Sequence, residues 1–457
     1  MYFMKQKGES VMINHLTKRM TYTQIIALSF LCVIGIGTVL LCLPVSSAGD
    51  RPADVLTALF TATSATCVTG LSLVNTGVYW SMFGQVVILL LIQIGGIGFM
   101  TLITMFSVFM KQRISLRERQ LMMVTSGNMR LDGIRPLFRR ILFGTLFFEG
   151  IGAALLAIRF CGQFGPTKGI WFAVFHSVSA FCNAGFDVLG DVGLVSLTSY
   201  YGDPLVILTV CALIIIGGIG FFVWSDLLKC RGRWKLMQLH SKIALSTTAL
   251  LILLGWVLFN LFERNAAFAG MDTGERLLAS LFQSVTPRTA GFNSVDQAAL
   301  SNSGSMLTIL FMFIGGSPCS TAGGFKTVTF AVLVVSTVYS ARNERDTIIF
   351  CRRLHASTVR QASAIATFYL FAVIGCTLTI CAIEPFGLRE VLFEVTSAIG
   401  TTGLSMGITA SLGSASKLIL ILLMYAGRIG GLSLFLVLAE KRVQPPVSRP
   451  AENILIG

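Results

Sequence analysis

The segment Thr69-Gly-Leu-Ser72 recurs as Thr402-Gly-Leu-Ser405, and two variants stand between them, Ala184-Gly-Phe-Asp187 and Ala290-Gly-Phe-Asn293. Their central glycines are separated by 115, 106 and 112 residues. Each segment follows an amphipathic run that carries Ser or Thr and precedes a long apolar stretch that contains Gly-Gly. Four diverged copies of one unit predict a pseudo-four-fold axis, and in a membrane such an axis predicts a pore.

The composition is typical of a membrane protein. Hydrophobic residues make up 54% and charged residues 12% of the chain, whereas about 25% of the residues in a soluble domain are charged. A membrane-spanning helix needs about 20 predominantly apolar residues. Segments of that length are found at 22–44, 81–110, 138–160, 203–229, 243–262, 305–340, 359–383 and 417–439. We therefore expect an all-α polytopic membrane protein with eight transmembrane helices in one bundle.

Basic residues are concentrated in alternate connections of this bundle. Of the 35 Lys and Arg residues, 25 lie in the terminal segments or in the loops 111–140, 229–242 and 341–360. Because positively charged loops face the cytoplasm, both termini and these loops are predicted to be cytoplasmic. The net charge of +14 thus reflects topology and does not indicate a nucleic-acid-binding protein. The same loops also suit anionic membrane lipid or a cytosolic partner.

A short amphipathic run precedes each of the four glycines. Three runs, Phe60 to Ser64, Phe175 to Ser179 and Phe393 to Ser397, end six residues before the glycine, and the fourth, Phe282 to Thr286, ends one residue closer. Such runs of 10–14 residues are too short to cross a bilayer, so we expect half-helices that enter from outside. The C-terminus of each carries a charge of about −0.5, and four of them together favour a cation.

The residues after each half-helix are predicted to be extended and to form an ion filter. Non-helical backbone at membrane depth is tolerated only inside the protein or along a water-filled path, where its carbonyl groups replace the hydration shell of an ion. Glycine at the centre permits a positive φ and leaves the lumen open. Helix packing is the alternative for any single glycine. The predicted filter residues are Val68, Thr69, Gly70, Asn183, Ala184, Gly185, Thr289, Ala290, Gly291, Thr401, Thr402 and Gly403.

These motifs resemble those of the Trk/Ktr/HKT superfamily of potassium transporters, whose members are similar to four fused units of outer helix, pore helix and inner helix. The resemblance covers nearly all of residues 20–445, including Ile314–Lys326 and Ala426–Gly431. Eight spans that begin near residue 22 are most similar to the membrane subunits of the bacterial Ktr system. The expected divisions are the cytoplasmic N-terminus 1–21, repeat 1 at 22–110, a loop at 111–137, repeat 2 at 138–229, a loop at 230–242, repeat 3 at 243–340, a loop at 341–358, repeat 4 at 359–439 and the cytoplasmic tail 440–457.

The resemblance implies a gated, channel-like potassium uptake subunit in the bacterial plasma membrane. It implies a homodimer that assembles with a cytosolic nucleotide-binding RCK ring of the KtrA type, with K⁺ as the transported ion, Na⁺ as an accompanying ion and no bound organic cofactor. In the superfamily a serine at the first filter glycine goes with sodium preference, so Gly70 favours potassium. A Trk-type or sodium-conducting relative is the alternative. Asp187 and Asn293 replace Ser72 and Ser405 of the other copies, so the outer site is expected to be asymmetric.

The third inner helix contains an unusual concentration of helix breakers. In a helix interior glycine costs about 1 kcal/mol and proline about 3 kcal/mol, so we expect an irregular intramembrane loop at 314–326, with a simple kink as the alternative. The family resemblance implies a flexible plug beneath the filter, and Lys326 either anchors it or repels cations. The candidate gating residues are Gly315, Gly316, Ser317, Pro318, Cys319, Ser320, Thr321, Ala322, Gly323, Gly324 and Lys326.

Arg428 is a charged residue in the middle of an otherwise apolar span. Such a residue is costly in a membrane and indicates a functional site. We expect it to face the lumen below the filter as an electrostatic barrier, or else to form a structural ion pair. Glu149 is a second isolated charge and a possible partner for some other group.

Nothing in the sequence indicates an enzyme. The four histidines, His15, His176, His240 and His355, have neither the spacing of a metal site nor that of a catalytic triad. Gly95-Gly-Ile-Gly98 lies inside an apolar segment without the Lys-Ser/Thr of a phosphate loop and is better explained by close helix packing. Nucleotide control would therefore come from a partner, and the loops 111–140 and 341–360 are the candidate docking sites. A pore-like scaffold or sensor that conducts no ion is the remaining alternative.

Overall fold

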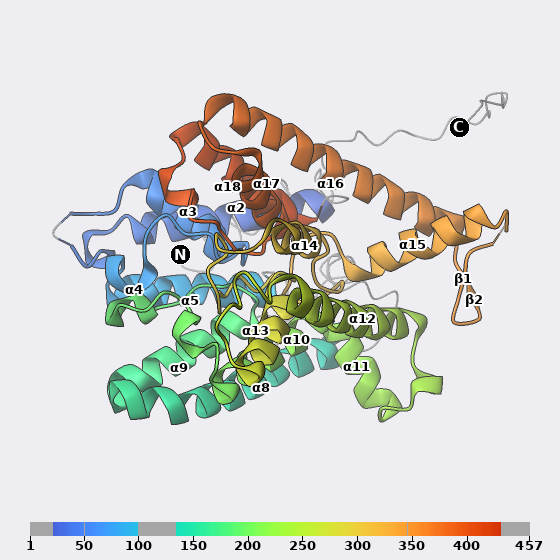
Figure 1. Cartoon of the computed structure of the whole chain (residues 1–457), viewed down its shortest axis with the longest axis horizontal. Helices are drawn as coiled ribbons and strands as arrows, with labels where there is room; N and C mark the ends of the chain where they lie inside the picture. The colour runs from blue at the N-terminus through green and yellow to red at the C-terminus, as the bar shows by residue number, and fades with distance from the viewer. Residues whose placement is uncertain (1–21, 50, 99–133, 345, 431–457) are drawn as a thin grey trace, which may run out of the picture.

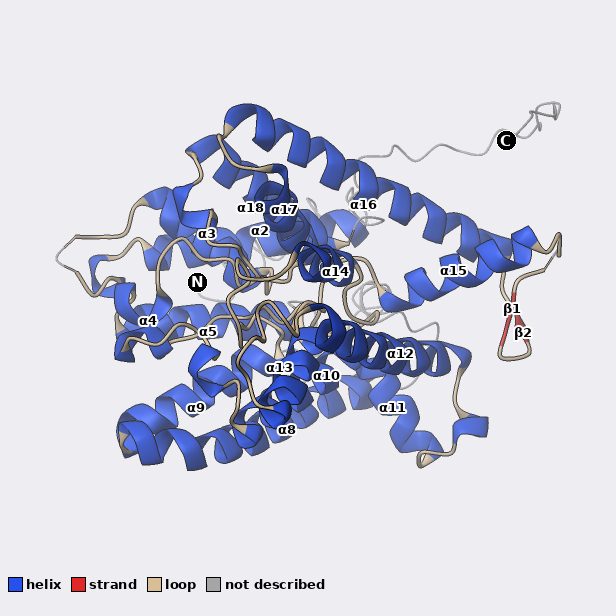
Figure 2. Ribbon diagram, viewed as in Figure 1, coloured by secondary structure: helices blue, strands red, loops and turns tan. Residues whose placement is uncertain are grey.

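The computed structural model describes residues 22–49, 51–98, 134–344 and 346–430, and these are mostly helical (Figure 1, Figure 2). The same order of elements occurs four times along them: a long helix, a short helix, an extended segment and a second helix. A hairpin of β1 (Ile348–Ile349) and β2 (Arg352–Arg353) lies between the third and fourth groups. The predicted N-terminus 1–21, most of the loop 111–137, the ends of the segments 81–110 and 417–439, and the tail 440–457 fall outside the described residues.

The first two groups follow one another around the left and lower parts of Figure 1. The first consists of α2 (Tyr22–Leu41), α3 (Val55–Thr66), the single turn α4 (Thr76–Tyr79) and α5 (Met82–Ile97). The second consists of α8 (Ile134–Phe164), α9 (Pro166–Phe181), α10 (Pro204–Ile219) and α11 (Phe221–Cys230). The short helices begin at residues suited to that role, because Asp54 caps α3 by accepting a hydrogen bond from the Leu56 amide at 3.2 Å and α9 starts at Pro166.

The last two groups complete the arrangement. The third consists of α12 (Leu239–Phe262), α13 (Thr273–Val285), α14 (Asn302–Phe313) and α15 (Thr327–Ala341). The fourth consists of α16 (Ala356–Ile383), α17 (Leu388–Gly400) and α18 (Ser414–Ile429). Short 3₁₀ turns occur at Pro44–Ser46, Leu189–Val192, Thr198–Tyr200, Trp234–Leu236 and Thr409–Ser411. A capping box of Asp272 and Glu275 starts α13.

The long helix of each group is a candidate membrane span. Among the described residues, α2, α8, α12 and α16 are long and apolar enough to cross a membrane, and a fifth span results if α10 and α11 are counted as one bent element. The helices α5, α14 and α15 are apolar but shorter. The segment 203–229, which we expected as one span, is bent by 89° at Gly220. The eight-span arrangement and the cytoplasmic placement of both termini stay predictions.

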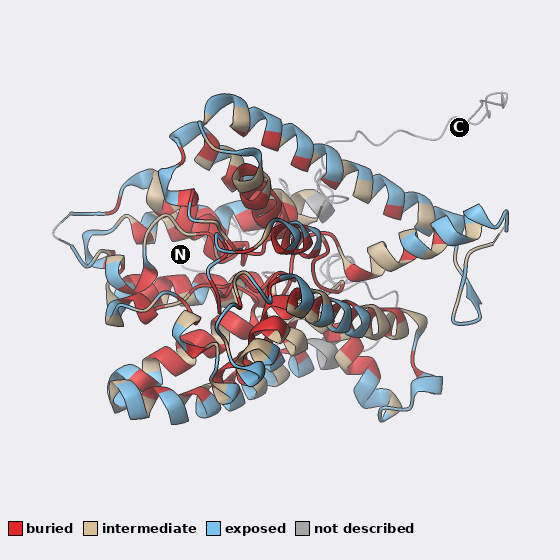
Figure 3. Ribbon diagram, viewed as in Figure 1, coloured by how far each residue is buried: buried red, intermediate tan, exposed pale blue. Residues whose placement is uncertain are grey.

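In a soluble helical bundle the apolar side chains are buried and the polar ones are exposed, and here the distribution is the reverse (Figure 3). Only 22–33% of the residues in the most apolar stretch of each long helix are buried, and large apolar side chains such as Phe371 of α16 are exposed. The second halves of the short helices α3, α9, α13 and α17, which carry many Ser and Thr residues, are buried instead. Apolar surface outside and polar groups inside suit a lipid environment.

Candidate functional site

The C-terminal ends of the four short helices come together in the middle of the molecule, and the chain leaves each of them by a left-handed residue. Val68, Asn183, Thr289 and Thr401 have φ values of 57°, 58°, 80° and 50°. Each of these turns is closed by a backbone hydrogen bond to the end of the short helix, as in the 2.8 Å bond from the Thr69 amide to the Ser64 carbonyl oxygen. The non-helical backbone is therefore tied to a buried helix end and not free to rearrange.

The four central glycines form a closed ring, which we call the glycine ring. All four have positive φ, at 93° for Gly70, 69° for Gly185, 79° for Gly291 and 90° for Gly403. A Cβ atom added to any of these glycines would point at the next segment of the ring. It would meet the carbonyl oxygen of the residue that precedes the glycine of that segment. The pairs are Gly70 with Ala184, Gly185 with Ala290, Gly291 with Thr402, and Gly403 with Thr69. Because the fourth pair returns to the first segment, the order around the ring is the order along the chain.

The glycine ring requires glycine for both conformational and steric reasons. A Cβ atom built on Gly185 would lie 2.6 Å from the carbonyl oxygen of Ala290 and 2.9 Å from the Cα atom of Gly291. Contacts this close to backbone atoms are not relieved by side-chain rotation, and positive φ is unfavourable for other residues. The ring thus brings together four backbone carbonyl groups, those of Thr69, Ala184, Ala290 and Thr402, with no side chain between neighbouring segments.

The Ser or Thr residue at the end of each amphipathic run forms a hydrogen bond to the extended segment that follows it. These bonds are of two kinds. In the first and fourth groups, Ser64 and Ser397 each accept a hydrogen bond from the glycine amide at 3.1 Å. In the second and third groups, Ser179 donates to the carbonyl oxygen of Phe186 at 2.8 Å and Thr286 donates to that of Phe292 at 2.6 Å. The four segments are therefore similar in course and different in detail.

A cavity of about 310 Å³ opens on one side of the glycine ring and is lined by all four glycines. Its wall includes the four residues expected to form the asymmetric outer site, Ser72, Asp187, Asn293 and Ser405. Asp187 is the only acidic residue that lines it in the described part of the chain. Burial raises the pKa of the Asp187 carboxyl to about 6. Because this carboxyl is ionised at neutral pH, the cavity attracts cations.

A second carboxylate lies behind the same wall. Glu394 of α17 is buried, and its two oxygens accept hydrogen bonds from Ser405 and, at 3.0 Å, from Thr409. Both residues line the cavity. The residues that follow the aligned Phe60, Phe175 and Phe282 are Thr61, His176 and Gln283, so the fourth segment alone has a carboxylate at this position.

On the opposite side of the glycine ring, residues 314–326 interrupt the third inner helix between Phe313 and Thr327. Backbone hydrogen bonds attach this loop to α10 and α11, from the Ser317 amide to Gly218 O at 2.9 Å and from the Phe221 amide to Cys319 O at 2.8 Å. The Thr321 hydroxyl donates to Phe181 O at the end of α9 at 3.1 Å. The loop is therefore packed directly beneath a half-helix end.

Lys326 and Arg428 both bond to the backbone of this loop. The Lys326 ammonium donates to Ala322 O at 2.7 Å and to Gly323 O at 3.1 Å, so it braces the loop from within. Arg428 of α18 donates to Thr321 O on one side and, on the other, to Gly95 O and to Gly96 O at 3.3 Å. The guanidinium thus joins the loop to the C-terminal turn of α5.

Arg428 and Glu149, the two isolated charges of the sequence, do not form a salt bridge with each other. The partners of Arg428 are backbone carbonyl groups, and the salt bridges within the described ranges involve other residues. Glu149 of α8 accepts hydrogen bonds from Gln93 of α5 at 3.0 and 3.1 Å and contacts the Cys182 thiol at 3.9 Å. Glu149 therefore links α8 to α5 beside the end of α9.

Sequence reasoning missed how the inner helices end. The motif Gly-Gly-Ile-Gly occurs at 95–98 and 217–220, and Gly-Arg-Ile-Gly at 427–430. The first glycine of each packs on the last turn of its half-helix, and the final residues, Gly98, Gly220 and Gly430, end the helix with φ of 87°, 107° and 92°. Close packing was therefore only part of the role of this motif. Aligning the three copies would have shown that Arg428 occupies the position of Gly96 and Gly218.

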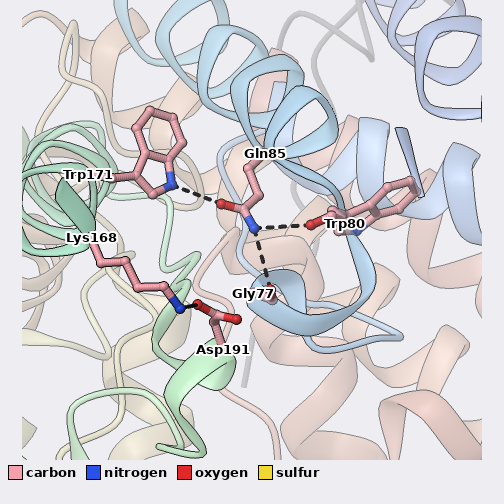
Figure 4. A network of polar contacts seen from close by, with 6 residues as sticks. All are labelled: Gly77, Trp80, Gln85, Lys168, Trp171 and Asp191. Atoms are coloured by element: carbon pink, nitrogen blue, oxygen red, sulfur yellow. Dashed lines mark hydrogen bonds and ion pairs between the residues drawn. The ribbon is translucent and has the colours of Figure 1, made fainter. Parts of the chain in front are cut away.

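A polar network near the starts of α5 and α9 joins the first two groups (Figure 4). Gln85 accepts a hydrogen bond from the Trp171 indole at 2.8 Å and donates to Trp80 O at 3.0 Å. Beside it, Lys168 forms a 2.7 Å ion pair with Asp191. These contacts join the start of the half-helix α9 to the start of α5. Across the ranges that the structure describes, no cluster of His, Cys, Asp or Glu is placed to hold a metal ion.

Comparison with known proteins gives three consistent findings. The family described as "TrkH: Cation transport protein" matches residues 11–446. The potassium/sodium uptake protein NtpJ of Enterococcus hirae is 40% identical over 98% of this chain and 100% of its own length, and the Ktr system potassium uptake protein B of Bacillus subtilis is 40% identical over 96% and 97%. The crystal structure of the potassium transporter TrkH from Vibrio parahaemolyticus has the same fold, with a TM-score of 0.73, 18% identity and coverage of 92% of this chain and 86% of that one.

Proposed function

The chain belongs to the TrkH family of cation transport proteins, and from that premise we propose that it is the ion-translocating subunit of a bacterial potassium uptake system. Membership confirms the resemblance found in the sequence. It also confirms that the chain is a polytopic membrane transporter and not an enzyme. Potassium is the proposed ion because relatives at 40% identity are named as potassium uptake proteins.

The observation that carries this proposal is the glycine ring. Four backbone carbonyl groups approach one another at the ends of four half-helices, and carbonyl groups in that arrangement replace the water around an ion. The negative ends of the half-helix dipoles add to the attraction for a cation. Glycine at all four positions lets neighbouring segments approach with no side chain between them. On this proposal the filter is formed by the twelve residues predicted from the sequence.

The loop 314–326 is the proposed gate. It lies beneath the glycine ring and is held by α10 and α11, by the end of α9 and by Arg428. A cation that passes the ring meets this loop, Lys326 and Arg428 in turn, so the two positive charges oppose passage while the loop stays in place. Opening then requires the loop to leave its contacts with Gly218 and Phe221. Nine of its residues are Gly, Ser, Thr, Ala or Cys, which suits a segment that moves.

The proposed assembly follows the sequence expectations. The chain would form a homodimer, with eight spans per subunit and both termini in the cytoplasm, and would bind a nucleotide-binding RCK ring. The support is that the relative from Bacillus subtilis is named as a protein of a Ktr system. The basic loop 341–360, with the hairpin β1–β2, is the proposed contact region within the described residues.

A sodium-conducting transporter is the second candidate, because one relative is named a potassium/sodium uptake protein. The two are separated by expressing the chain in a potassium-uptake-deficient bacterium, with and without an RCK partner. Growth at limiting potassium, unaffected by added sodium, is the expected result. Failure to grow despite a normal amount of protein in the membrane would contradict potassium uptake, and inhibition by sodium would favour the second candidate.

A further inference from the structure

An apolar pocket lies behind the bend that holds the gating loop. It has a volume of about 960 Å³ and is formed by one face of α8 and by both sides of the α10–α11 bend. Its walls are aromatic and aliphatic, with Phe143, Phe147 and Trp224 among them, and Arg140 is the only charged residue that lines it in the described part of the chain. The pocket thus has one charged end and an apolar body.

The pocket has the dimensions of a single leaflet. Along α8 its lining runs from Arg140 to Phe148, a rise of about 12 Å for eight helical residues. Half of the hydrocarbon core of a bilayer is about 15 Å thick. Arg140 lies at the basic end of α8, and Arg139 beside it stacks on Phe143 at 5.5 Å, so the charged end lies where lipid headgroups are found.

The wall of the pocket that contains Trp224 packs against residues that contact the loop 314–326. The Trp224 ring packs on Phe148, Phe221 and Phe181 at centroid distances of 5.2, 5.3 and 5.7 Å. Phe181 is the last residue of α9, and its carbonyl oxygen accepts the hydrogen bond from Thr321. Whatever fills the pocket therefore contacts Trp224, which packs on the residue that accepts the hydrogen bond from the gating loop.

We propose that one anionic phospholipid of the cytoplasmic leaflet occupies this pocket, with an acyl chain against Trp224 and its phosphate on Arg140, and that its binding stabilises the closed position of the loop 314–326. Charge complementarity supports an anionic headgroup, because Arg140 is joined by the exposed Lys229, which directly follows Leu228 of the pocket wall. The apolar depth supports an acyl chain. The effect on the gate rests on the proposed function, whereas the binding does not.

Trp224 provides a direct probe of occupancy. The purified full-length chain is placed in phosphatidylcholine bilayers that contain increasing fractions of phosphatidylglycerol with brominated acyl chains, and the fluorescence lost in wild type but not in Trp224→Phe is measured. We expect quenching that saturates at a low fraction of the anionic lipid. Brominated phosphatidylcholine should quench only in proportion to its amount.

The headgroup contact is tested by Arg140→Gln, with Arg233→Gln as the matched control that removes an exposed charge outside the pocket. Arg140→Gln should shift half-saturation to an anionic lipid fraction roughly fivefold higher, whereas Arg233→Gln should leave it unchanged. Equal, unsaturable quenching by both lipids would overturn the proposal. So would an absence of Trp224 quenching, which would place a protein surface, such as a second copy, in the pocket.

The gating effect has its own measurement. In liposomes, phosphatidylglycerol should slow potassium uptake by wild type and by Arg233→Gln more than by Arg140→Gln. Saturable binding with an equal effect of the lipid on all three would overturn the coupling to the gate alone. Saturable binding without any potassium transport would contradict the proposed function while leaving the lipid site in place.

Discussion

At the scale of single residues, the glycine ring depends on backbone conformation more than on side-chain chemistry. The residues that lead into it have left-handed φ although none of the four is a glycine, and such a conformation costs about 1–3 kcal/mol per residue. Hydrogen bonds from the preceding half-helices hold them there, as between Thr69 and Ser64. On the proposed function, this strained backbone aligns the carbonyl groups before an ion arrives.

Gly185→Ala should abolish or strongly reduce potassium uptake. Its Cβ would meet Ala290 O at 2.6 Å, and alanine at a φ of 69° is strained, so one segment of the ring has to move. The measurement is the initial rate of uptake at equal amounts of protein in the membrane. Gly150→Ala in α8, where a Cβ meets no atom within 4 Å, is the control and should transport normally. Normal uptake by Gly185→Ala would show that the ring does not form the ion path.

Asp187 should make potassium uptake sensitive to pH. Its pKa is raised to about 6, above the ordinary value, so the carboxylate is lost as pH falls through 6 and the attraction for cations falls with it. The apparent KM for potassium should therefore rise between pH 7 and pH 5. In Asp187→Asn it should be high at both pH values.

The control for this pH dependence is Asp191→Asn. Asp191 pairs with Lys168 in a different pocket, so its removal should leave the pH profile unchanged. A profile for Asp187→Asn that matches the wild type would exclude this carboxyl as the cause.

Sequence reasoning reached the glycines but not all of their neighbours. The spacing from each Ser or Thr to its glycine was visible, since the same chemistry recurs four times. That Ser64 and Ser397 accept a hydrogen bond whereas Ser179 and Thr286 donate one was not, because the choice depends on small differences in backbone course. The hydrogen bonds that Glu394 accepts from Ser405 and Thr409 were also missed, because both partners follow the predicted filter residues in the sequence.

At the scale of elements, Arg428 connects three of them. It bonds to the loop 314–326 and to α5 from its own position on α18. Arg428→Gln removes both the positive charge below the ring and most of these bonds. The potassium turnover rate should therefore rise about tenfold, which corresponds to a barrier lower by about 1.4 kcal/mol, with little change in KM.

Turnover is measured as the maximal rate of uptake per molecule in proteoliposomes. Arg233→Gln, which removes a surface charge, should leave the rate unchanged. An unchanged rate in a well-folded Arg428→Gln protein would contradict the barrier and leave Arg428 a structural residue.

The elements themselves were partly predictable. The break in the third inner helix followed from its Gly and Pro residues, because their cost in a helix is intrinsic. The 89° bend at Gly220 did not, because glycines such as those at 217, 218 and 220 are frequent in membrane-spanning helices and are compatible with a straight one. There the outcome is set by tertiary contacts, since the loop 314–326 bonds to the backbone on both sides of the bend.

At the scale of the whole molecule, four similar groups each contribute one segment to the glycine ring but differ in what else they contribute. The third contributes the loop, the fourth contributes Arg428 and Glu394, and the second contributes Asp187. The order of the groups around the ring is the order along the chain. We therefore expect all four groups to contribute to ion selectivity. We expect only the third group, with its loop, and the fourth, with Arg428, to control ion passage.

The most direct test is the ratio of potassium to sodium flux through the purified chain in proteoliposomes, compared between wild type and Gly70→Ser. Wild type should conduct potassium in preference to sodium. In Gly70→Ser the added side chain meets Ala184 O of the neighbouring segment, so the ratio should fall about tenfold or more. A sodium flux that exceeds the potassium flux in wild type, or a ratio left unchanged by Gly70→Ser, would contradict selection by the glycine ring.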